Sequence, residues 1–365
     1  MKHTMTNMDA AGAGSLGPEA RRAIDMFLRD WDERMMLPRW LATYKRAKES
    51  FARLIGTEEN SVAGVPNVSS AAGMVANALS VGPRSSVVTS DMELPSNYYP
   101  WILCRRRGAT VKVAKSRGFR VPLEELERLI DDRTILVTLS HVTYTSGFRH
   151  DLEKLCRLSH RLGAFVFVDA HQSAGAIRLD VTESDVDFLA TGSSKWLSAL
   201  PGAGFLYVSP KVIDKLHTFL PGWLGSADPA AVDAEEFVEA DGARRFETGT
   251  PNILGYVAVG AALERLLDFG MERVEERILS LTGWLMEELD GLGFDVVTPR
   301  ERRLRAGIVS FRASSDSGVV VSELFERGIK VSHTEAGVRV SIHYTNKEEE
   351  IEHLLKSLRE ICPAG

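Results

Sequence analysis

The stretch DFLATGSSKWLSALPGAGFLYV, residues 187–208, places a lysine between two apolar runs. The first run has the composition of a buried strand and leads through four small residues to Lys195. A second apolar run, rich in glycine, follows the lysine. Lysine usually lies on a solvated face with only its alkyl stem covered. The position of Lys195 therefore indicates a function that requires an amine inside an α/β core.

Short β-rich runs alternate with helical patterns around this stretch. They lie at 85–90, 109–114, 134–140, 164–170, 187–192 and 203–209. Between two of these runs, residues 151–163 carry apolar side chains at helical spacing and end on a glycine, which predicts a helix. Continuous apolar strands that alternate with helices are typical of a largely parallel sheet covered on both faces. We therefore expect a large α/β domain over residues 46–255.

The pattern changes after Pro251. Helices are predicted at 253–269, 271–292, near 317–327 and at 347–361, with β-rich runs between them. This order predicts a second, smaller α+β domain with an antiparallel sheet over residues 256–365. Residues 1–45 are expected to pack back onto one of the two domains. The acidic segment 220–245 is interpreted as a solvated loop near the substrate pocket.

Composition and cysteine spacing exclude several classes of function. The chain has 44 basic and 50 acidic residues and a net charge of -6, which argues against nucleic acid as a partner because phosphate binding needs a basic face. Cys104, Cys156 and Cys362 are far apart and show no CxxC spacing, so neither a disulfide framework nor a metal site is expected. No segment reaches the roughly 20 apolar residues needed to cross a bilayer. Because an apolar signal core is also missing, we expect a cytoplasmic protein that binds no membrane.

An aspartate closes the apolar strand predicted at 164–170. Asp169 is costly to bury without a partner, although a helix cap or a structural ion pair would also explain it. Ligands collect at the carboxyl ends of strands in an open parallel sheet, where Asp169 and Lys195 could approach one cavity. A buried lysine and a buried carboxylate suit pyridoxal phosphate, since the lysine forms a Schiff base with the aldehyde and the carboxylate keeps a proton on the pyridine nitrogen.

A phosphate group on such a cofactor would need an anion site. Ser69 and Ser70 stand at the start of a small-residue helix, and a helix N-terminus favours an anion. Serine is also a common helix cap, so this signal alone is weak.

Four motifs in this order resemble one family. They are VDAHQSAG (168–175), SSKWL with PGAGFLYV (193–208), RFETGTPN (245–252) and VRVSIHYTNKEEEI (338–351). They are similar to the class V aminotransferases, a group of pyridoxal-phosphate enzymes that includes kynureninases, cysteine desulfurases, isopenicillin N epimerase-like proteins and C–S lyases of cysteine conjugates. The resemblance covers nearly the whole chain. It implies the aspartate-aminotransferase-type fold (fold type I) and a homodimer with shared active sites.

The resemblance also implies a role for individual residues. Lys195 would be the Schiff-base lysine and the base that moves the Cα proton, with Asp169 on the pyridine nitrogen. Arg339 would clamp the substrate α-carboxylate, and His141 or Tyr144 would assist the leaving group. The implied cofactor contacts are Ser69, Ser70, Ala71, Leu94, Gln172, Ser194, Trp223 and Thr250, the last reaching the phosphate of the partner subunit. The implied substrate contacts besides Arg339 are Asn97 and His343.

Some positions depart from the family pattern. Leu94 occupies the position where relatives usually stack an aromatic side chain on the cofactor ring, and Asn97 and Ser194 differ from the kynureninase residues. Cysteine desulfurases carry a nucleophilic cysteine just before the strand that holds the arginine. The corresponding connection, residues 327–341, contains no cysteine, so we expect an enzyme other than a cysteine desulfurase.

The cofactor leaves several reactions open. We expect β-elimination, with cleavage of a C–S bond in a cysteine conjugate, and keep transamination as the first alternative. Epimerisation, decarboxylation and kynureninase-like hydrolysis remain open, because sequence does not fix how Lys195 is aimed. A protein that binds the cofactor without catalysis is a further alternative, but such a protein would be expected to lose Lys195 or Arg339.

Overall fold

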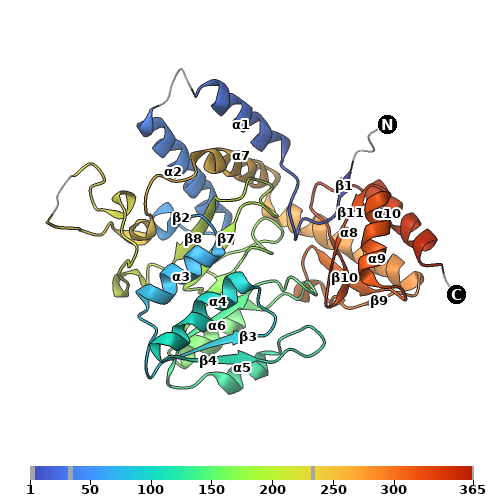
Figure 1. Cartoon of the computed structure of the whole chain (residues 1–365), viewed down its shortest axis with the longest axis horizontal. Helices are drawn as coiled ribbons and strands as arrows, with labels where there is room; N and C mark the ends of the chain where they lie inside the picture. The colour runs from blue at the N-terminus through green and yellow to red at the C-terminus, as the bar shows by residue number, and fades with distance from the viewer. Residues whose placement is uncertain (1–4, 32–35, 232–234, 364–365) are drawn as a thin grey trace.

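The computed structural model describes residues 5–31, 36–231 and 235–363. They form a large α/β unit around a seven-stranded sheet and a smaller unit around a four-stranded sheet (Figure 1). The helix α8 (Met271–Gly291) belongs to both, because its first half contributes to the core of the large unit and its second half to the core of the small unit.

The seven-stranded sheet is mixed and mostly parallel, as predicted. Its strands are β2 (Val62–Val65), β3 (Ser86–Ser90), β4 (Thr110–Ala114), β5 (Thr134–Ser140), β6 (Phe165–Asp169), β7 (Phe188–Gly192) and β8 (Gly204–Val208). The spatial order is β2-β8-β7-β6-β5-β3-β4. Neighbours from β4 to β7 pair in parallel, whereas β8 runs antiparallel to both β7 and β2. All six predicted runs form strands, and β2 is an additional strand at the edge.

Helices cover both faces of this sheet. One face packs against α3 (Val68–Ala78) and α4 (Pro95–Leu103). The other packs against α2 (Leu37–Leu54), α5 (Leu123–Leu129), α6 (Leu152–Arg161) and α7 (Ile253–Phe269). Successive strand residues point to opposite faces, so Val87 lies in the first core and Val88 in the second. The domain boundary predicted at 255/256 falls inside α7, whose apolar residues belong to the large unit.

The small unit is an antiparallel sheet with helices packed against it. Its strands follow the order β12 (Ser332–Thr334), β13 (Gly337–Ser341), β10 (Ile308–Arg312) and β9 (Asp295–Val296). The helices α9 (Ser317–Glu326) and α10 (Glu348–Ile361) pack with the second half of α8 on this sheet. The short 3-10 helices of the chain are η1 (Glu59–Ser61), η2 (Cys104–Arg107), η3 (Ile213–Lys215), η4 (Trp223–Gly225), η5 (Gly242–Phe246) and η6 (Arg302–Leu304).

The N-terminal segment runs across both units. Its strand β1 (Thr6–Asn7) pairs in parallel with β11 (Ile329–Lys330) of the small unit. The chain then crosses to the large unit, where α1 (Pro18–Arg29) packs against α7, which in turn packs against α2 (Figure 1). Among the described residues, no helix combines the length and the apolar character needed to cross a membrane.

Candidate functional site

The ends of β5, β6 and β7 bring three predicted site residues to one edge of the sheet. Asp169 is the last residue of β6 and pairs with Ser140 of β5 and Ala190 of β7. His141 follows β5 and donates its backbone N–H to the Asp169 carbonyl at 2.9 Å. Lys195 lies in the turn between β7 and β8. Carboxyl ends of adjacent parallel strands meet at one edge of a sheet, which is why residues far apart in sequence converge here.

Lys195 keeps part of its surface exposed at this edge, but protein surrounds most of its amine. Burial, opposed by the attraction of Asp169, lowers the pKa of Lys195 to about 8. Arg339 lowers this pKa further, and Asp9 raises it. A substantial fraction of the amine is therefore neutral near physiological pH, and a neutral lysine amine can act as a nucleophile or as a base.

Asp169 supplies a carboxylate beside this amine. Only 5% of its surface is exposed, and its Oδ1 accepts a hydrogen bond from the His171 backbone N–H at 2.8 Å. Burial raises the pKa of Asp169, while the His171 hydrogen bond and the charge of Lys195 oppose the rise. A buried carboxylate with few hydrogen bonds is suited to a cationic partner such as a protonated ring nitrogen.

Ser69 and Ser70, the predicted phosphate contacts, lie in the first turn of α3. Asn67 caps the helix and accepts hydrogen bonds from the Ser70 backbone N–H and hydroxyl at 2.9 and 3.2 Å. Ser69 is exposed and Ser70 partly exposed, whereas Ala71 is buried. An amine with a lowered pKa, a buried carboxylate and an open helix N-terminus fit the aldehyde, the ring nitrogen and the phosphate of pyridoxal phosphate.

The other predicted cofactor contacts are spread more widely. Ser194 precedes Lys195 and is partly exposed, and Thr250 is exposed on this single chain. Trp223 lies in η4 and packs partly buried against the core of the large unit. The Gln172 side chain bonds within the protein at both ends, because its Nε2 donates to the Ala11 carbonyl at 3.1 Å and its Oε1 accepts from Trp196 Nε1 at 2.9 Å.

Arg339 lies on β13 and reaches the large unit. Its Nη1 donates to the backbone carbonyl of Tyr144 at 3.0 Å, and its Nε donates to the Ser332 hydroxyl at 3.0 Å. Its Nη2 donates to Asp9 Oδ1 at 3.1 Å. The predicted substrate clamp is thus joined to the predicted Tyr144, and Asp9 is a partner that sequence reasoning missed.

At neutral pH the Tyr144 hydroxyl keeps its proton and the His141 imidazole is uncharged. Burial raises the pKa of Tyr144, and nearby Glu335 raises it further, so its hydroxyl keeps its proton at neutral pH. Burial lowers the pKa of His141 far below its usual value, helped by Arg149 and His150. Among the described residues, His141 Nδ1 has no hydrogen-bond partner.

A second missed residue, Glu93, organises the segment that includes Leu94. Its Oε2 accepts hydrogen bonds from the Ser140 backbone N–H at 2.8 Å, the Ser140 hydroxyl at 2.6 Å and Asn97 Nδ2 at 2.8 Å. Its Oε1 accepts from the Ser90 hydroxyl at 2.9 Å. Burial raises the pKa of Glu93 against these hydrogen bonds. The available sequence signal was an acidic residue directly before Leu94.

Asn97 and His343, two predicted substrate contacts, are both held by other protein groups. Asn97 is fully buried, and its Oδ1 accepts from the Thr138 hydroxyl at 2.9 Å. His343 Nδ1 pairs with the Thr345 hydroxyl at 2.8 Å, and its Nε2 lies 3.2 Å from the Trp196 carbonyl. Burial lowers the pKa of His343 to about 4. Leu94 lies half-buried directly before α4.

His171 is a third residue at this site that sequence reasoning left out. Burial lowers its pKa to about 3, and the charge of Lys195 lowers it further. Its Nε2 has no hydrogen-bond partner among the described residues. This nitrogen lies against Gly192, where a Cβ atom would come within 2.9 Å of it.

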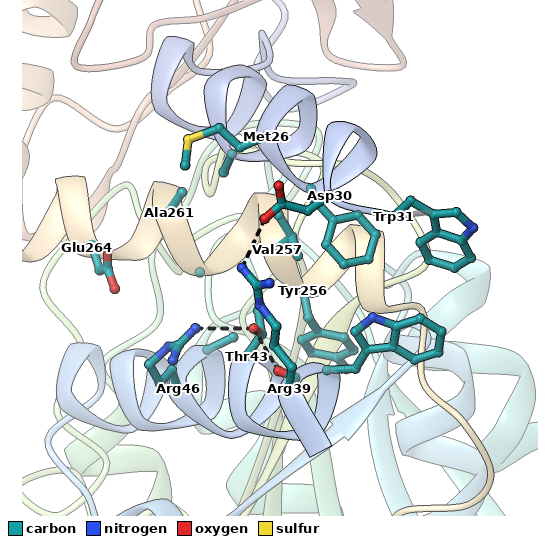
Figure 2. Close-up of a pocket in the computed structure, with 15 residues that line it drawn as sticks. Met26, Asp30, Trp31, Arg39, Thr43, Arg46, Tyr256, Val257, Ala261 and Glu264 are labelled. Atoms are coloured by element: carbon teal, nitrogen blue, oxygen red, sulfur yellow. Dashed lines mark hydrogen bonds and ion pairs between the residues drawn. The ribbon is translucent and has the colours of Figure 1, made fainter. Parts of the chain in front are cut away.

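A separate pocket lies between α1, α2 and α7. Its volume is about 270 Å³, and Figure 2 shows the Asp30–Arg39 ion pair and the side chains of Trp31 and Tyr256 around it. None of the residues that line it is a predicted site residue. The site at the sheet edge is therefore identified by the chemistry of its side chains rather than by this pocket.

Comparisons with known proteins give the family of this chain. The family model described as aminotransferase class V matches residues 35–354. An uncharacterised aminotransferase, YcbU, from Bacillus subtilis is 32% identical over 86% of this chain and 82% of its own length. A probable cysteine desulfurase from Methanothermobacter thermautotrophicus is 30% identical over 88% of this chain and 84% of its own length. A solved lysine-to-alanine mutant of C-DES, with glycine covalently linked to its PLP cofactor, has a TM-score of 0.91 at 23% identity and covers 100% of this chain and 97% of that one.

The expected exclusion of cysteine desulfurases was wrong. The relative from Methanothermobacter thermautotrophicus, named a probable cysteine desulfurase, aligns with most of this chain. The exclusion rested on the missing cysteine at 327–341, a segment that follows α9 and contains the strands β11 to β13. A missing loop cysteine tests only whether the protein supplies a thiolate at that point. It says nothing about the fold and the family that this chain shares with desulfurases.

Proposed function

Since this chain belongs to the class V aminotransferase family and is a pyridoxal-phosphate enzyme that acts on amino acids, we propose that it cleaves the C–S bond of a cysteine conjugate by β-elimination. The observation that carries the proposal is the convergence of three groups at one edge of the sheet: Lys195 after β7, the buried carboxylate of Asp169 at the end of β6, and Tyr144, whose carbonyl accepts a hydrogen bond from Arg339 at 3.0 Å. The pKa of Lys195, about 8, supports it. β-Elimination begins when a base removes the α-proton, and a base is most effective when its pKa lies near the working pH.

Three groups of residues would hold the cofactor. Lys195 would bind its aldehyde, Asp169 its ring nitrogen, and the start of α3 with Ser69 and Ser70 its phosphate. Ser194 and Gln172 border this region, and Thr250 would reach the phosphate of the partner subunit. Bound pyridoxal phosphate supplies a ring that accepts the electron pair of a bond broken at the substrate α-carbon.

The protein side chains would then direct which bonds break. Arg339 binds the substrate α-carboxylate and fixes the orientation of the α-carbon. Lys195 takes the α-proton. Tyr144 lies next to Arg339 through its carbonyl and keeps its hydroxyl proton because its pKa is raised, so it can donate to the departing sulfur. His141 is the second candidate for this donation.

The overall reaction consumes one water. The Cβ–S bond breaks, the sulfur takes a proton and leaves as a thiol, and water releases the remaining carbon chain as pyruvate and ammonia. Cofactor and enzyme return to their starting form, so no oxidant or reductant is needed. Transamination, in contrast, would leave the amino group on the cofactor and release a keto acid.

A product screen tests this proposal. The cofactor-loaded enzyme is given an S-substituted cysteine, free cysteine and L-alanine in separate samples, and pyruvate, ammonia, alanine, sulfide and pyridoxamine phosphate are measured. Pyruvate and ammonia in equal amounts from the S-substituted cysteine are expected. Pyridoxamine phosphate with a keto acid would replace the proposal by transamination, and alanine with released sulfur would replace it by desulfuration.

A further inference from the structure

Arg339 already holds a carboxylate in this structure. Asp9 and Arg339 are each 7% exposed, and Asp9 Oδ1 lies 3.1 Å from Arg339 Nη2. The Ser332 hydroxyl joins the same group, because it donates to Asp9 Oδ1 at 2.9 Å and accepts from Arg339 Nε at 3.0 Å. Ser332 lies directly opposite Arg339 in the β12–β13 pair, so neighbouring strands present both side chains on one face.

The contacts of Arg339 leave a particular pair of donors available. A guanidinium group has five N–H bonds, one on Nε and two on each terminal nitrogen. Ser332 takes the Nε proton, the Tyr144 carbonyl takes one Nη1 proton, and Asp9 takes one Nη2 proton. Within the described part of the chain, one N–H on each terminal nitrogen has no hydrogen-bond partner. Two parallel N–H donors match the two oxygens of a carboxylate.

The N-terminal segment fixes the position of Asp9. Ser341 donates its backbone N–H to the Met8 carbonyl at 2.7 Å, and the Asp9 backbone N–H donates to Asn7 Oδ1 at 3.0 Å. Gly12 lies close behind the carboxylate, since a Cβ atom there would come within 2.3 Å of Asp9 Oδ2. The carboxylate is thus held between Gly12 on one side and Arg339 on the other.

The same segment connects this ion pair to the catalytic lysine. The Gly14 backbone N–H donates to the Ser194 carbonyl at 2.9 Å, and a Cβ atom on Gly14 would come within 2.0 Å of the Lys195 carbonyl. Asp9 and Arg339 are both close enough to Lys195 to act on its charge in opposite directions. A substrate whose amino group is bound beside Lys195 would therefore direct its carboxylate toward the Asp9–Arg339 ion pair.

We propose that Asp9 is a positioning residue for substrate recognition, which holds the guanidinium of Arg339 so that its two remaining terminal N–H groups receive the substrate α-carboxylate. This inference rests on the proposed role of Arg339 as the carboxylate clamp. Asp9 acts only through Arg339 and does not touch the reacting atoms. A rigid guanidinium loses less entropy when the substrate binds, so the contribution of Asp9 falls on binding rather than on proton transfer.

Two matched ligands test the proposal. L-alanine and ethylamine differ by the carboxylate, and each is titrated into the cofactor-loaded protein while the visible absorbance of bound pyridoxal phosphate is followed. Asp9→Ala is expected to raise the dissociation constant of L-alanine about tenfold or more and that of ethylamine less than about threefold. Asp9→Asn keeps an oxygen at the Oδ1 position, so its L-alanine dissociation constant should stay within about threefold of the wild-type value.

Two further variants distinguish a specific loss of carboxylate binding from a general folding defect. Gly12→Ala pushes on Asp9 from behind and should weaken L-alanine binding selectively, as Asp9→Ala does. Asp295→Asn is the matched control, because it removes an exposed ion pair with Arg312 at the opposite edge of the same sheet. It should leave both ligands unaffected. Thermal unfolding of the cofactor-free proteins checks that each variant is folded.

Several results would overturn the role of Asp9. An equal loss of L-alanine and ethylamine binding in Asp9→Ala would make the residue structural, and an unchanged dissociation constant would make it dispensable. Tighter L-alanine binding would make Asp9 a competitor of the substrate. The reaction products decide the proposed function separately, since a protein that binds L-alanine but releases no pyruvate from an S-substituted cysteine contradicts elimination and leaves this test of Asp9 intact.

Discussion

Lys195 and Asp169 are buried groups whose pKa values move in opposite directions. Burial lowers the pKa of the lysine to about 8 and raises that of the aspartate. Their mutual attraction opposes both shifts, so each residue partly preserves the charge of the other. This balance leaves Lys195 able to lose its proton near neutral pH, which an exposed lysine does only at much higher pH.

The lowered pKa of Lys195 predicts the pH dependence of cofactor attachment. Only the neutral amine attacks an aldehyde, so the attachment rate of pyridoxal phosphate to the cofactor-free protein should rise with pH and level off above a midpoint of about 8. Asp169 and Asp9 raise this pKa and Arg339 lowers it, so Asp169→Asn should move the midpoint to lower pH. Stopped-flow absorbance measures the rate. A midpoint near 10.5, the ordinary value for lysine, would contradict the account.

At the scale of elements, one hydrogen-bonded carboxylate ties the end of β5 to the segment before α4. Glu93 accepts from the backbone and hydroxyl of Ser140, one residue before His141, and from Asn97 in α4. This arrangement sets where Leu94 lies relative to the sheet edge. Glu93 therefore helps to position this edge of the sheet, where its charge also interacts with Asp169 and Tyr144.

The loss of Glu93 should destabilise the protein. Glu93→Ala leaves the Ser140 N–H and the Asn97 amide without their acceptor, and we expect the free energy of unfolding to fall by about 2–4 kcal/mol. Glu93→Gln retains an oxygen acceptor and should cost about half as much. Urea denaturation measures both variants. Equal stability of Glu93→Ala and the wild-type protein would show that these hydrogen bonds do not fix the segment.

At the scale of the whole molecule, exposed apolar side chains suggest a second subunit. Two of the large ones, Tyr99 and Leu103, lie in α4. Three more lie in the loop segment after η3, namely Phe219, Leu220 and Phe237. Each of the five is at least 45% exposed. Ser69 and Thr250, two predicted phosphate contacts, are exposed on the single chain as well. A second copy that covers these surfaces would complete a site shared between subunits.

The resulting prediction is a stable homodimer. Sedimentation equilibrium of the cofactor-loaded protein should give twice the chain mass of 40.2 kDa. Phe219→Asp together with Leu220→Asp places charges on the predicted interface and should shift the equilibrium toward the monomer and weaken cofactor binding. A wild-type protein that stays at 40.2 kDa and retains full cofactor affinity would contradict the shared site.

Local patterns made most of the fold predictable, including the placement of Lys195 and Asp169 at one edge of the large sheet. Six strands of the large sheet are short β-rich runs between helical patterns, and Asp169 and Lys195 stand out because each follows directly or closely after such an apolar run. The strand β2 was missed because it has only four residues, VAGV. Asp9 and Glu93 were missed because their partners are distant in sequence, 330 residues away for Arg339 and 47 for Ser140. Contacts of this kind depend on the whole topology, which no short stretch of sequence records.

The central claim is that this site breaks a C–S bond and returns its cofactor unchanged. The most direct measurement is the ratio of thiol to pyruvate that the loaded enzyme releases from an S-aryl cysteine, with Lys195→Ala as the control. The account predicts one pyruvate for every thiol over many turnovers and a loss of about 10²–10⁴-fold in rate for the variant. A keto acid formed with one pyridoxamine phosphate per site in place of thiol and pyruvate, or no thiol release at all, would contradict it.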